Sequence, residues 1–366
     1  MILKDLKLHN FRNYGDESFV FDPAVNLILG ENAQGKTNLL EAIAALSTTR
    51  LFRTGQKKEG VRLGEQRAVI IGNFVTENID IEMEMRISKD KTTEIWKNGS
   101  RLKRLSDAQG LLKTVLFCPD DLMLIRAGAA ARRKFLDTAL CQLRPGYATV
   151  LSEYEKVLSH KLRILRDSEE YPEMLDLLDD FTLRLCRLGS ILIRYRARYA
   201  ETLSTRAGEI HGEAAPGEVL QIGYDTVSTV VDPLASSEII EVQLREHAQS
   251  HRTAEIASKS TLSGCHKDDL SILLNGLPAA SYASQGQTRT AALALKLAER
   301  DMFYRADGEY PLLLLDDVLS ELDRKRQDFV LNRLGNGQVF ITSCEEETAP
   351  RFGAGKVFTI ASGRSI

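Results

Sequence analysis

The sequence predicts an α/β fold in which a mixed sheet, with an antiparallel part and a phosphate-loop core, is interrupted by a mainly α-helical arm. An apolar strand, a glycine-delimited loop and an amphipathic helix follow one another from Val25 to Ala44. Helical spacing replaces two-residue alternation from about Pro119 to residue 210. A β–α–β rhythm returns between Pro311 and Thr342, as a doubly wound sheet requires.

Composition predicts an ordinary water-soluble protein of the cytoplasm. The 366 residues carry a net charge of −3, so nucleic-acid binding would depend on local basic patches. The five cysteines are scattered without a C-x-x-C pair, which argues against a zinc site or a disulfide framework. The first ten residues lack a signal-peptide core, and no apolar run approaches the ~20 residues that cross a bilayer. We therefore expect no membrane contact.

The loop from Gly30 to Thr37, GENAQGKT, fits the pattern G-x-x-x-x-G-K-[ST] without a mismatch. Its glycines permit backbone angles that turn successive N–H groups inward around a polyphosphate, and the following helix adds its positive N-terminal end. In such a loop Lys36 reaches the β- and γ-phosphates, and the Thr37 hydroxyl ligates Mg²⁺. The flanking strand and helix argue against a chance match in a surface turn.

Basic residues near this loop leave alternatives open. Arg12 lies in an aromatic and basic cluster, Asn10–Tyr14, and either touches the nucleotide or packs at the sheet edge. The basic loop from Arg50 to Lys58 is either solvated or contacts a phosphate backbone. Strands separated by strong turn signals then predict an antiparallel meander over residues 68–74, 79–87 and 92–97.

The inserted arm is expected to contain an αα-hairpin. Apolar residues recur on one helical face from Tyr147 to Leu165 and again from Leu177 to Leu192. Helices of this length joined by a short turn make an arm roughly 30–40 Å long. Arginines between Arg184 and Arg198 either contact DNA or form a solvated face. The expected domains are residues 1–119 with 262–366, and residues 120–261 for the arm.

A downstream motif offers a second anion site. Ser284, Gly286 and Gln287 open a helix expected over residues 285–305. A hydroxyl, a glycine and free N–H groups at a helix N-terminus bind anions. The same residues fit the capping-box pattern S-x-x-Q, so a purely structural cap remains the alternative.

The apolar run Leu312–Leu315 ends in Asp316 and Asp317. Such a run suits a central parallel strand buried on both faces, whose carboxyl end presents ligand groups. There Asp316 would hold Mg²⁺, and Asp317 would accept a proton from the attacking water. Two buried carboxylates would be costly without a cation. Ser320–Asp323 begins the next helix.

These motifs, in this order, resemble the ATP-binding-cassette (ABC) class of ATPases, whose head is divided by an insertion. Asn10–Tyr14 resembles the start of the DNA-repair branch that includes the SMC and Rad50 heads. Within that branch the chain resembles the RecF family over roughly residues 1–345. The strings that carry this resemblance are GENAQGKTNLL (30–40), FCPDDL (117–122), RRKFLD (132–137), CHKDDL (265–270), SQGQTRT (284–290) and LLDDVLSELD (314–323).

The resemblance implies a head that binds ATP with Mg²⁺ and hydrolyses it slowly in response to DNA, with Lys36, Asp316 and Asp317 as catalytic residues. The implied metal ligands are Thr37 and Asp316. Residues of the 284–287 signature would contact ATP bound to a second subunit in a head-to-tail homodimer. The implied nucleotide-binding residues are Arg12, Gly30, Glu31, Asn32, Ala33, Gln34, Gly35, Lys36, Thr37, Asn38, Ser284, Gly286, Gln287 and, at the dimer seam, Asp323.

The resemblance also implies a role in recombinational repair and replication restart, at the nucleoid. Double-stranded and gapped DNA, RecR and RecO would be the partners, and RecA would be loaded at single-strand gaps. Two alternatives remain: the ATPase subunit of a membrane transporter, and an ATP-gated scaffold with negligible hydrolysis. Loss of turnover in Asp317→Asn with function retained would favour the scaffold.

The sequence departs from the family pattern in three places. No proline follows Gly128, and Cys265 stands where a proline is expected. No histidine follows the strand at 339–342, although transporter ATPases place one there. The γ-phosphate sensor is therefore left open, with Thr342 or Ser343 as substitutes.

Overall fold

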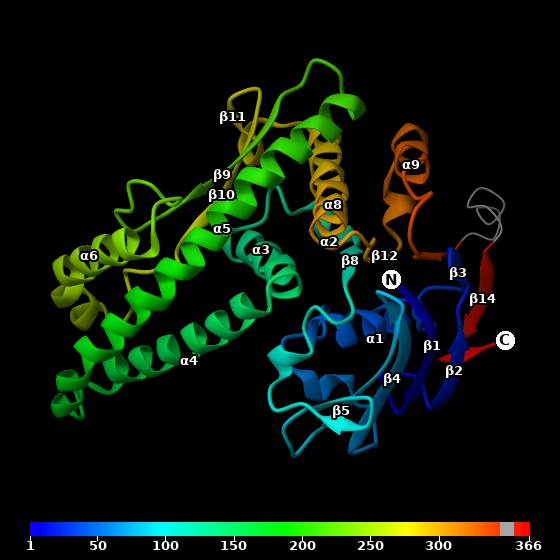
Figure 1. Ribbon diagram of the computed structural model, residues 1–366, viewed down its shortest axis with the longest axis horizontal. Coiled ribbons are helices and arrows are strands. Elements are labelled where there is room, and N and C mark those ends of the chain that lie inside the picture. The colour runs from blue at the N-terminus through cyan, green and yellow to red at the C-terminus, as the bar shows by residue number, and fades with distance from the viewer. Residues whose placement is uncertain (345–354) are drawn as a thin grey trace. The chain divides into compact units, whose positions relative to one another are not determined.

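The computed structural model describes residues 1–344 and 355–366, which form two compact units (Figure 1). The first unit contains Met1–Met123 and Arg289–Ile366, and the second unit contains Leu124–Thr288. The second unit thus takes in residues 262–288, which the sequence analysis assigned to the head. The reason is strand pairing within the insertion. The three-stranded sheet of this unit has the order β11 (Leu277–Pro278), β10 (Asp269–Leu274), β9 (Leu220–Asp225).

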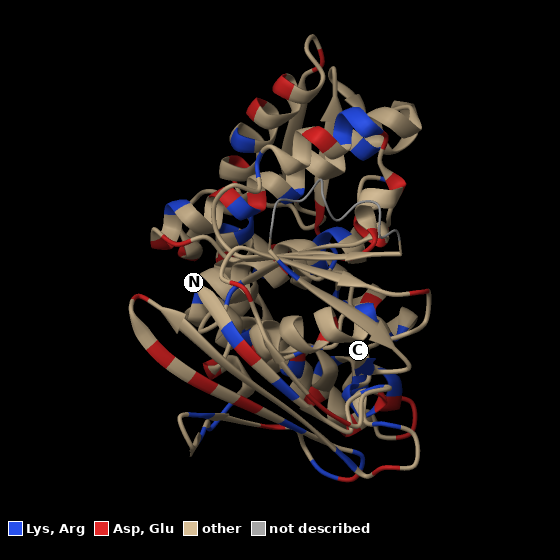
Figure 2. Cartoon of the chain, turned by 90° about the vertical axis from the view of Figure 1, so that its right-hand side faces the viewer, with Lys and Arg blue, Asp and Glu red and all other residues tan. Residues whose placement is uncertain are grey.

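An antiparallel sheet begins the first unit, as the alternating sequence predicts. The leucines of β1 are buried and Lys7 is exposed, which gives the sheet one buried face. Figure 2 shows acidic and basic residues interspersed along these strands. The strand order is β2 (Asp16–Val20), β1 (Ile2–His9), β4 (Arg67–Thr76), β5 (Ile79–Ser88), β6 (Glu94–Lys97), β7 (Ser100–Arg101).

A second, mostly parallel sheet carries the phosphate loop. Its β12 is buried along its whole length between two parallel neighbours, so the predicted central strand is confirmed. Because parallel strands end at the same edge, the carboxyl ends of β3, β8, β12 and β13 meet there. The strand order is β15 (Arg364–Ser365), β14 (Lys356–Ala361), β3 (Val25–Leu29), β13 (Val339–Ser343), β12 (Leu312–Leu315), β8 (Thr114–Phe117).

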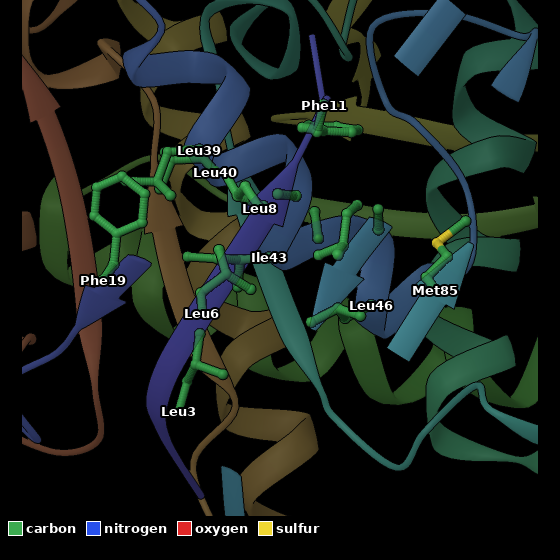
Figure 3. Close-up of a cluster of buried hydrophobic side chains, with 14 of the residues drawn as sticks. Leu3, Leu6, Leu8, Phe11, Phe19, Leu39, Leu40, Ile43, Leu46 and Met85 are labelled. Carbon is green, nitrogen blue, oxygen red and sulfur yellow. The ribbon is translucent and has the colours of Figure 1, made fainter. Parts of the chain in front are cut away.

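The core of the first unit forms where α1 (Lys36–Thr48) packs against strands of both sheets. Figure 3 shows apolar side chains of β1 meeting those of α1. Burying each of these large apolar side chains contributes about 1.5–3 kcal/mol. α1 is therefore held rigidly, and with it the loop from which it starts. The labelled residues in this core are Leu3, Leu6, Leu8, Phe11, Phe19, Leu39, Leu40, Ile43, Leu46 and Met85.

The remaining helices range from four to 37 residues. The first unit has α2 (Pro119–Leu122), α9 (Arg324–Leu331) and short 3₁₀ turns, including Lys57–Gly60 and Val318–Glu321. α8 (Gln285–Asp307) starts in the second unit and continues into the first. The second unit has α3 (Ala129–Leu143), α4 (Pro145–Asp167), α5 (Leu178–Ala214), α6 (Ser237–Ser258) and α7 (Ala279–Tyr282).

The predicted αα-hairpin is present, but α5 is longer than expected. Its 37 residues span about 55 Å, because the helix continues past Leu192 to Ala214. The apolar face predicted for α4 is buried. Among the described residues, none of the helices combines the length and apolarity needed to cross a lipid bilayer.

The arginines of α5 do not share one face. Arg196 is buried, and its guanidinium binds both oxygens of Asp137, at 2.8 and 2.9 Å, and the Cys265 carbonyl at 2.8 Å. Arg187 and Arg198 are exposed. The prediction that this arginine run meets DNA or solvent therefore fails for Arg196, which binds protein groups from α3 and from the segment before β10.

His266 has a structural environment. Tyr154 Oη lies 2.8 Å from His266 Nδ1, and Thr261 Oγ1 lies 2.8 Å from Nε2. Burial, together with nearby lysines and arginines, lowers the pKa of His266 to about 4. A neutral imidazole with both nitrogens bonded therefore holds the turn before β10.

Candidate nucleotide-binding site

The phosphate loop between β3 and α1 depends on two glycines. Gly30 has φ +149° and Gly35 has φ +123°, in the region that side chains disfavour. A Cβ on Gly30 would lie 2.4 Å from the Ile360 carbonyl oxygen, and one on Gly35 would lie 2.8 Å from Asn13 Nδ2. Both positions therefore exclude larger residues on backbone angle and on space.

The loop is braced from behind by the Asn10–Tyr14 cluster. Asn13 Nδ2 donates to the Gln34 carbonyl at 2.8 Å, and Tyr14 Oη donates to the Gly35 carbonyl at 2.9 Å. Asn38 Nδ2 in turn donates to Asn13 Oδ1 at 2.8 Å. On the other side, the N–H of Gly363 donates to the Gln34 carbonyl at 2.9 Å. The cluster thus fixes the loop's shape.

Arg12 makes its contacts with protein groups. Its Nε and Nη2 bind the two carboxylate oxygens of the buried Glu41, at 2.7 and 3.0 Å, and Nη1 donates to the Glu59 carbonyl. These bonds tie the Asn10–Tyr14 segment to α1 and to the 3₁₀ turn at Lys57–Gly60. A contact between Arg12 and nucleotide stays a prediction.

The ammonium of Lys36 lies inside the loop. Its Nζ donates to the carbonyls of Gly30 and Glu31, at 2.7 and 3.1 Å, and lies 3.0 Å from the sulfur of Cys344. Cys344 also lies 3.1 Å from Asn32 Oδ1. The sequence analysis did not identify Cys344 as a site residue. Its position directly after β13, at the carboxyl edge of the parallel strands, could have indicated it.

The expected magnesium ligands meet across the sheet edge. Thr37 Oγ1 donates to Asp316 Oδ1 at 2.9 Å, and Thr342 Oγ1 donates to the same oxygen at 3.0 Å. Burial raises the pKa of Asp316, with the two hydroxyls acting in the opposite direction and Asp317 adding to the rise. A buried, destabilised carboxylate beside a hydroxyl fits a hard divalent cation that keeps several waters.

No larger metal cluster competes with this assignment in the described part of the chain. Within residues 1–344 and 355–366, no three His, Cys, Asp or Glu side chains gather to hold a metal ion. A site with one carboxylate and one hydroxyl is complete only when phosphate oxygens and water add to it. The donor set therefore fits Mg²⁺ bound together with a nucleotide.

Asp317 has an unusual backbone. Its φ of +50° lies in the left-handed region, and its N–H donates to Thr342 Oγ1 at 2.8 Å. The Ser320 hydroxyl donates to the Asp317 carbonyl at 2.6 Å. Backbone strain of this kind concentrates at functional sites because the surrounding structure must maintain it.

Arg53 also lies near the site. Its positive charge lowers the pKa of Asp316, and its Nη1 donates to Asn38 Oδ1 at 2.9 Å.

Asp323 is the N-cap of α9. Its Oδ1 accepts from the Arg326 N–H at 3.0 Å, and this backbone bond lowers the pKa of Asp323. The Arg326 guanidinium pairs with Asp323 and donates through Nε to Thr290 Oγ1 at 2.9 Å. The cap explains the local structure, and a role of Asp323 at a dimer seam stays a prediction.

The signature residues form the expected reciprocal cap at the start of α8. The Ser284 N–H donates to Gln287 Oε1 at 2.8 Å, and the Gln287 N–H donates to Ser284 Oγ at 3.2 Å. Ser284 is exposed. The structure thus gathers the phosphate loop, Asp316 and Asp317 in the first unit, whereas Ser284, Gly286 and Gln287 belong to the second.

Comparisons with known proteins agree with these features. A family profile described as the RecF/RecN/SMC N-terminal domain matches residues 2–361. "DNA replication and repair protein RecF" of Lachnoclostridium phytofermentans is 35% identical over 366 residues, covering 99% of both chains. The Bacillus cytotoxicus protein of the same name is 39% identical, covering 94% of this chain and 92% of its own.

Solved structures show the same relationship. "Structure of the recombination mediator protein RecF-ATP in RecFOR pathway" has a TM-score of 0.92 at 34% identity, covering 100% of this chain and 97% of the other. A Pyrococcus furiosus Smc head with an extended coiled coil has a TM-score of 0.56 at 16% identity, covering 100% and 95%, and shows the fold alone. The predicted ABC-type ATPase head is confirmed.

Asp316→Asn should raise the melting temperature of the nucleotide-free protein near neutral pH. The folded carboxyl has a pKa above its unfolded value, so its ionised form weakens the fold once the pH exceeds both values. The gain should shrink as the pH falls and the folded wild-type carboxyl becomes protonated. The same change should abolish Mg²⁺-dependent nucleotide binding.

Thermal unfolding with and without Mg²⁺–ATP measures both effects of Asp316→Asn. Asp90→Asn, at an exposed turn, is the matched control and should change neither quantity. An Asp316→Asn protein that melts below wild type at neutral pH and still responds normally to Mg²⁺–ATP would contradict this account of Asp316.

Asp317→Asn should keep the fold and nucleotide binding while nucleotide hydrolysis is lost. Asparagine tolerates the left-handed backbone at this position, whereas alanine does not, so Asp317→Ala should also lower the free energy of unfolding by about 1 kcal/mol. Chemical denaturation and a phosphate-release assay check the pair. Equal stabilities for the two variants would show that Asp317 carries no backbone strain.

Proposed function

Because the chain belongs to the RecF family of DNA replication and repair proteins, we propose that it is an ATP-gated DNA-binding ATPase of recombinational repair. ATP with Mg²⁺ closes a head-to-tail homodimer on DNA, and slow, DNA-stimulated hydrolysis reopens it. The ATP-bound relative supports ATP as the ligand. The proposal rests chiefly on the 2.9 Å contact between Thr37 and Asp316, which joins the phosphate loop to the acidic strand end.

The geometry supports a division of labour within one chain. Lys36 is held among loop carbonyls that a polyphosphate would replace as its partner, and Thr37 with Asp316 would hold Mg²⁺. Asp317 would orient the attacking water and accept its proton. Thr342, bonded to both aspartates, is the best-placed substitute for a γ-phosphate-sensing histidine.

The signature supports a second division, between two chains. The exposed Ser284 hydroxyl and the first turn of α8 form an anion-binding surface that we assign to ATP on the partner subunit. Two ATP molecules would then lie between two heads, each held by one phosphate loop and one signature. Asp323 would lie at the seam.

Basic residues at one end of the antiparallel sheet are the best candidates for DNA contact. Strand pairing places Arg67 opposite Ser88, next to Lys89, and Gly60 lies against Ile87, which brings Lys57 and Lys58 to the same end. Burial and the nearby Arg50 lower the pKa of Lys57 to about 8. An anion would relieve this repulsion, so we assign the phosphate backbone of double-stranded or gapped DNA to this end, without sequence specificity.

The family relationship supports the wider setting of the proposal. RecR and RecO would be the protein partners, RecA would be loaded at single-strand gaps as a result, and the protein would work in the cytoplasm at the nucleoid. No described feature favours a transporter subunit. The scaffold alternative differs only in that ATP hydrolysis is not needed for function. An Asp317→Asn protein that no longer hydrolyses ATP but still functions would favour the scaffold.

Ser284→Arg should bind ATP with wild-type affinity but fail to dimerise. The added side chain blocks the signature while the phosphate loop of the same chain stays intact. Lys36→Ala should instead lose nucleotide affinity, because the loop's only ammonium is removed. Fluorescent-nucleotide titration and sedimentation with ATP and Mg²⁺ separate the two defects. A Ser284→Arg protein that dimerises normally with ATP would refute the role of the signature in trans.

Replacing Lys58 and Lys89 together with alanine should weaken DNA binding and flatten its salt dependence. Each lost phosphate contact lowers the slope of log affinity against log salt by about 0.9. Lys156→Ala, exposed on α4 and outside this end of the sheet, is the control. Fluorescence anisotropy with gapped DNA over a salt series measures both quantities. Unchanged slopes would place the DNA elsewhere.

A further inference from the structure

The signature glutamine is held at both ends of its amide. Gln287 Oε1 accepts from the Ser284 N–H at 2.8 Å, and Gln287 Nε2 donates to Glu218 Oε1 at 2.9 Å. The Ser284 carbonyl accepts from both the N–H and the hydroxyl of Thr288. The Gln287 side chain is thus engaged by protein groups, while the Ser284 hydroxyl accepts from Gln287 and keeps its own hydrogen for a ligand.

Glu218 is itself fixed in place. It follows Gly217, whose φ of +91° turns the chain between α5 and β9, and its N–H donates to the Ala215 carbonyl. Its second oxygen, Oε2, lies 2.9 Å from Nε2 of His211, which is fully buried near the end of α5. A carboxylate only accepts, so His211 donates through Nε2.

We propose that Glu218 is a positioning residue that fixes the signature turn, through Gln287, in the form that offers the Ser284 hydroxyl to ATP on the partner subunit. The inference deepens the proposed function and rests on it. His211 orients Glu218, so the end of α5 and the first turn of α8 are joined by one hydrogen-bonded chain. Gln287 then supports the turn, and the Ser284 hydroxyl with the N–H groups of the helix N-terminus donates hydrogen bonds to phosphate.

Two substitutions separate the geometry of Glu218 from its charge. Glu218→Ala removes both bonds and should weaken ATP-dependent dimerisation about tenfold, the usual consequence of losing a charge-assisted bond. Glu218→Gln keeps the acceptor for Gln287, and its amide can donate to His211 if the imidazole hydrogen moves to Nδ1, which has no other partner among the described residues. Glu218→Gln should therefore dimerise as wild type does. Nucleotide affinity of the monomer should be unchanged in both.

The experiment combines sedimentation with hydrogen exchange. Exchange is measured on nucleotide-free protein at the amides of Gln287 and Thr288, and should be about tenfold faster in Glu218→Ala than in wild type, Glu218→Gln or the exposed control Glu246→Ala. Sedimentation with ATP and Mg²⁺ then gives the dimerisation constants of the same four proteins.

The exchange arm does not depend on dimerisation, so the two proposals can fail separately. A wild type that stays monomeric with ATP refutes the proposed function, while exchange still decides whether Glu218 holds the turn. Unchanged exchange in Glu218→Ala overturns the positioning role. Faster exchange with wild-type dimerisation overturns it too, because the turn would then be irrelevant to the partner's ATP.

Discussion

The hydrogen bond between Thr37 and Asp316 is the contact on which the first unit's chemistry depends. It joins two residues 279 positions apart in the sequence, one at the start of α1 and the other at the end of β12. The parallel arrangement of β3, β13 and β12 makes this meeting unavoidable, since all three strands end at one edge. The buried core beneath α1 holds the loop at that edge, and the insertion leaves the sheet intact.

In the free protein, a buried carboxyl group and a strained backbone residue lie at this edge of the sheet. Burial raises the pKa of Asp316, and Asp317 adopts a left-handed backbone conformation. Lys36 donates to loop carbonyls and lies beside the sulfur of Cys344. A bound cation would offset the burial of Asp316, and a polyphosphate would give Lys36 an anionic partner, so ligand binding should also stabilise the fold by mass action. The site is therefore arranged for a ligand that carries both a cation and a negatively charged polyphosphate.

Local patterns in the sequence predicted much of this arrangement. The phosphate loop, the buried strand before Asp316 and the reciprocal cap of Ser284 and Gln287 are each set by neighbouring residues, and all are present. Partners from distant segments carry no such pattern. The buried pairing of Arg196 with Asp137, the contact of Cys344 with Lys36, and the bond from Glu218 to Gln287 arise only when elements pack. The assignment of residues 262–288 to the second unit likewise depends on the pairing of β10 with β9.

We propose that one working ATP site is built from the phosphate loop of one chain and the signature of another. Mixing Lys36→Ala protein with Ser284→Arg protein tests it most directly, with ATP hydrolysis on gapped DNA as the readout. Each variant alone should be inactive, because Lys36→Ala protein has no working phosphate loop and Ser284→Arg protein has no working signature. The mixture should recover hydrolysis, since one site of the mixed dimer combines an intact loop with an intact signature. Two folded variants that remain inactive when mixed, with Ser284→Arg still binding ATP, would contradict the account.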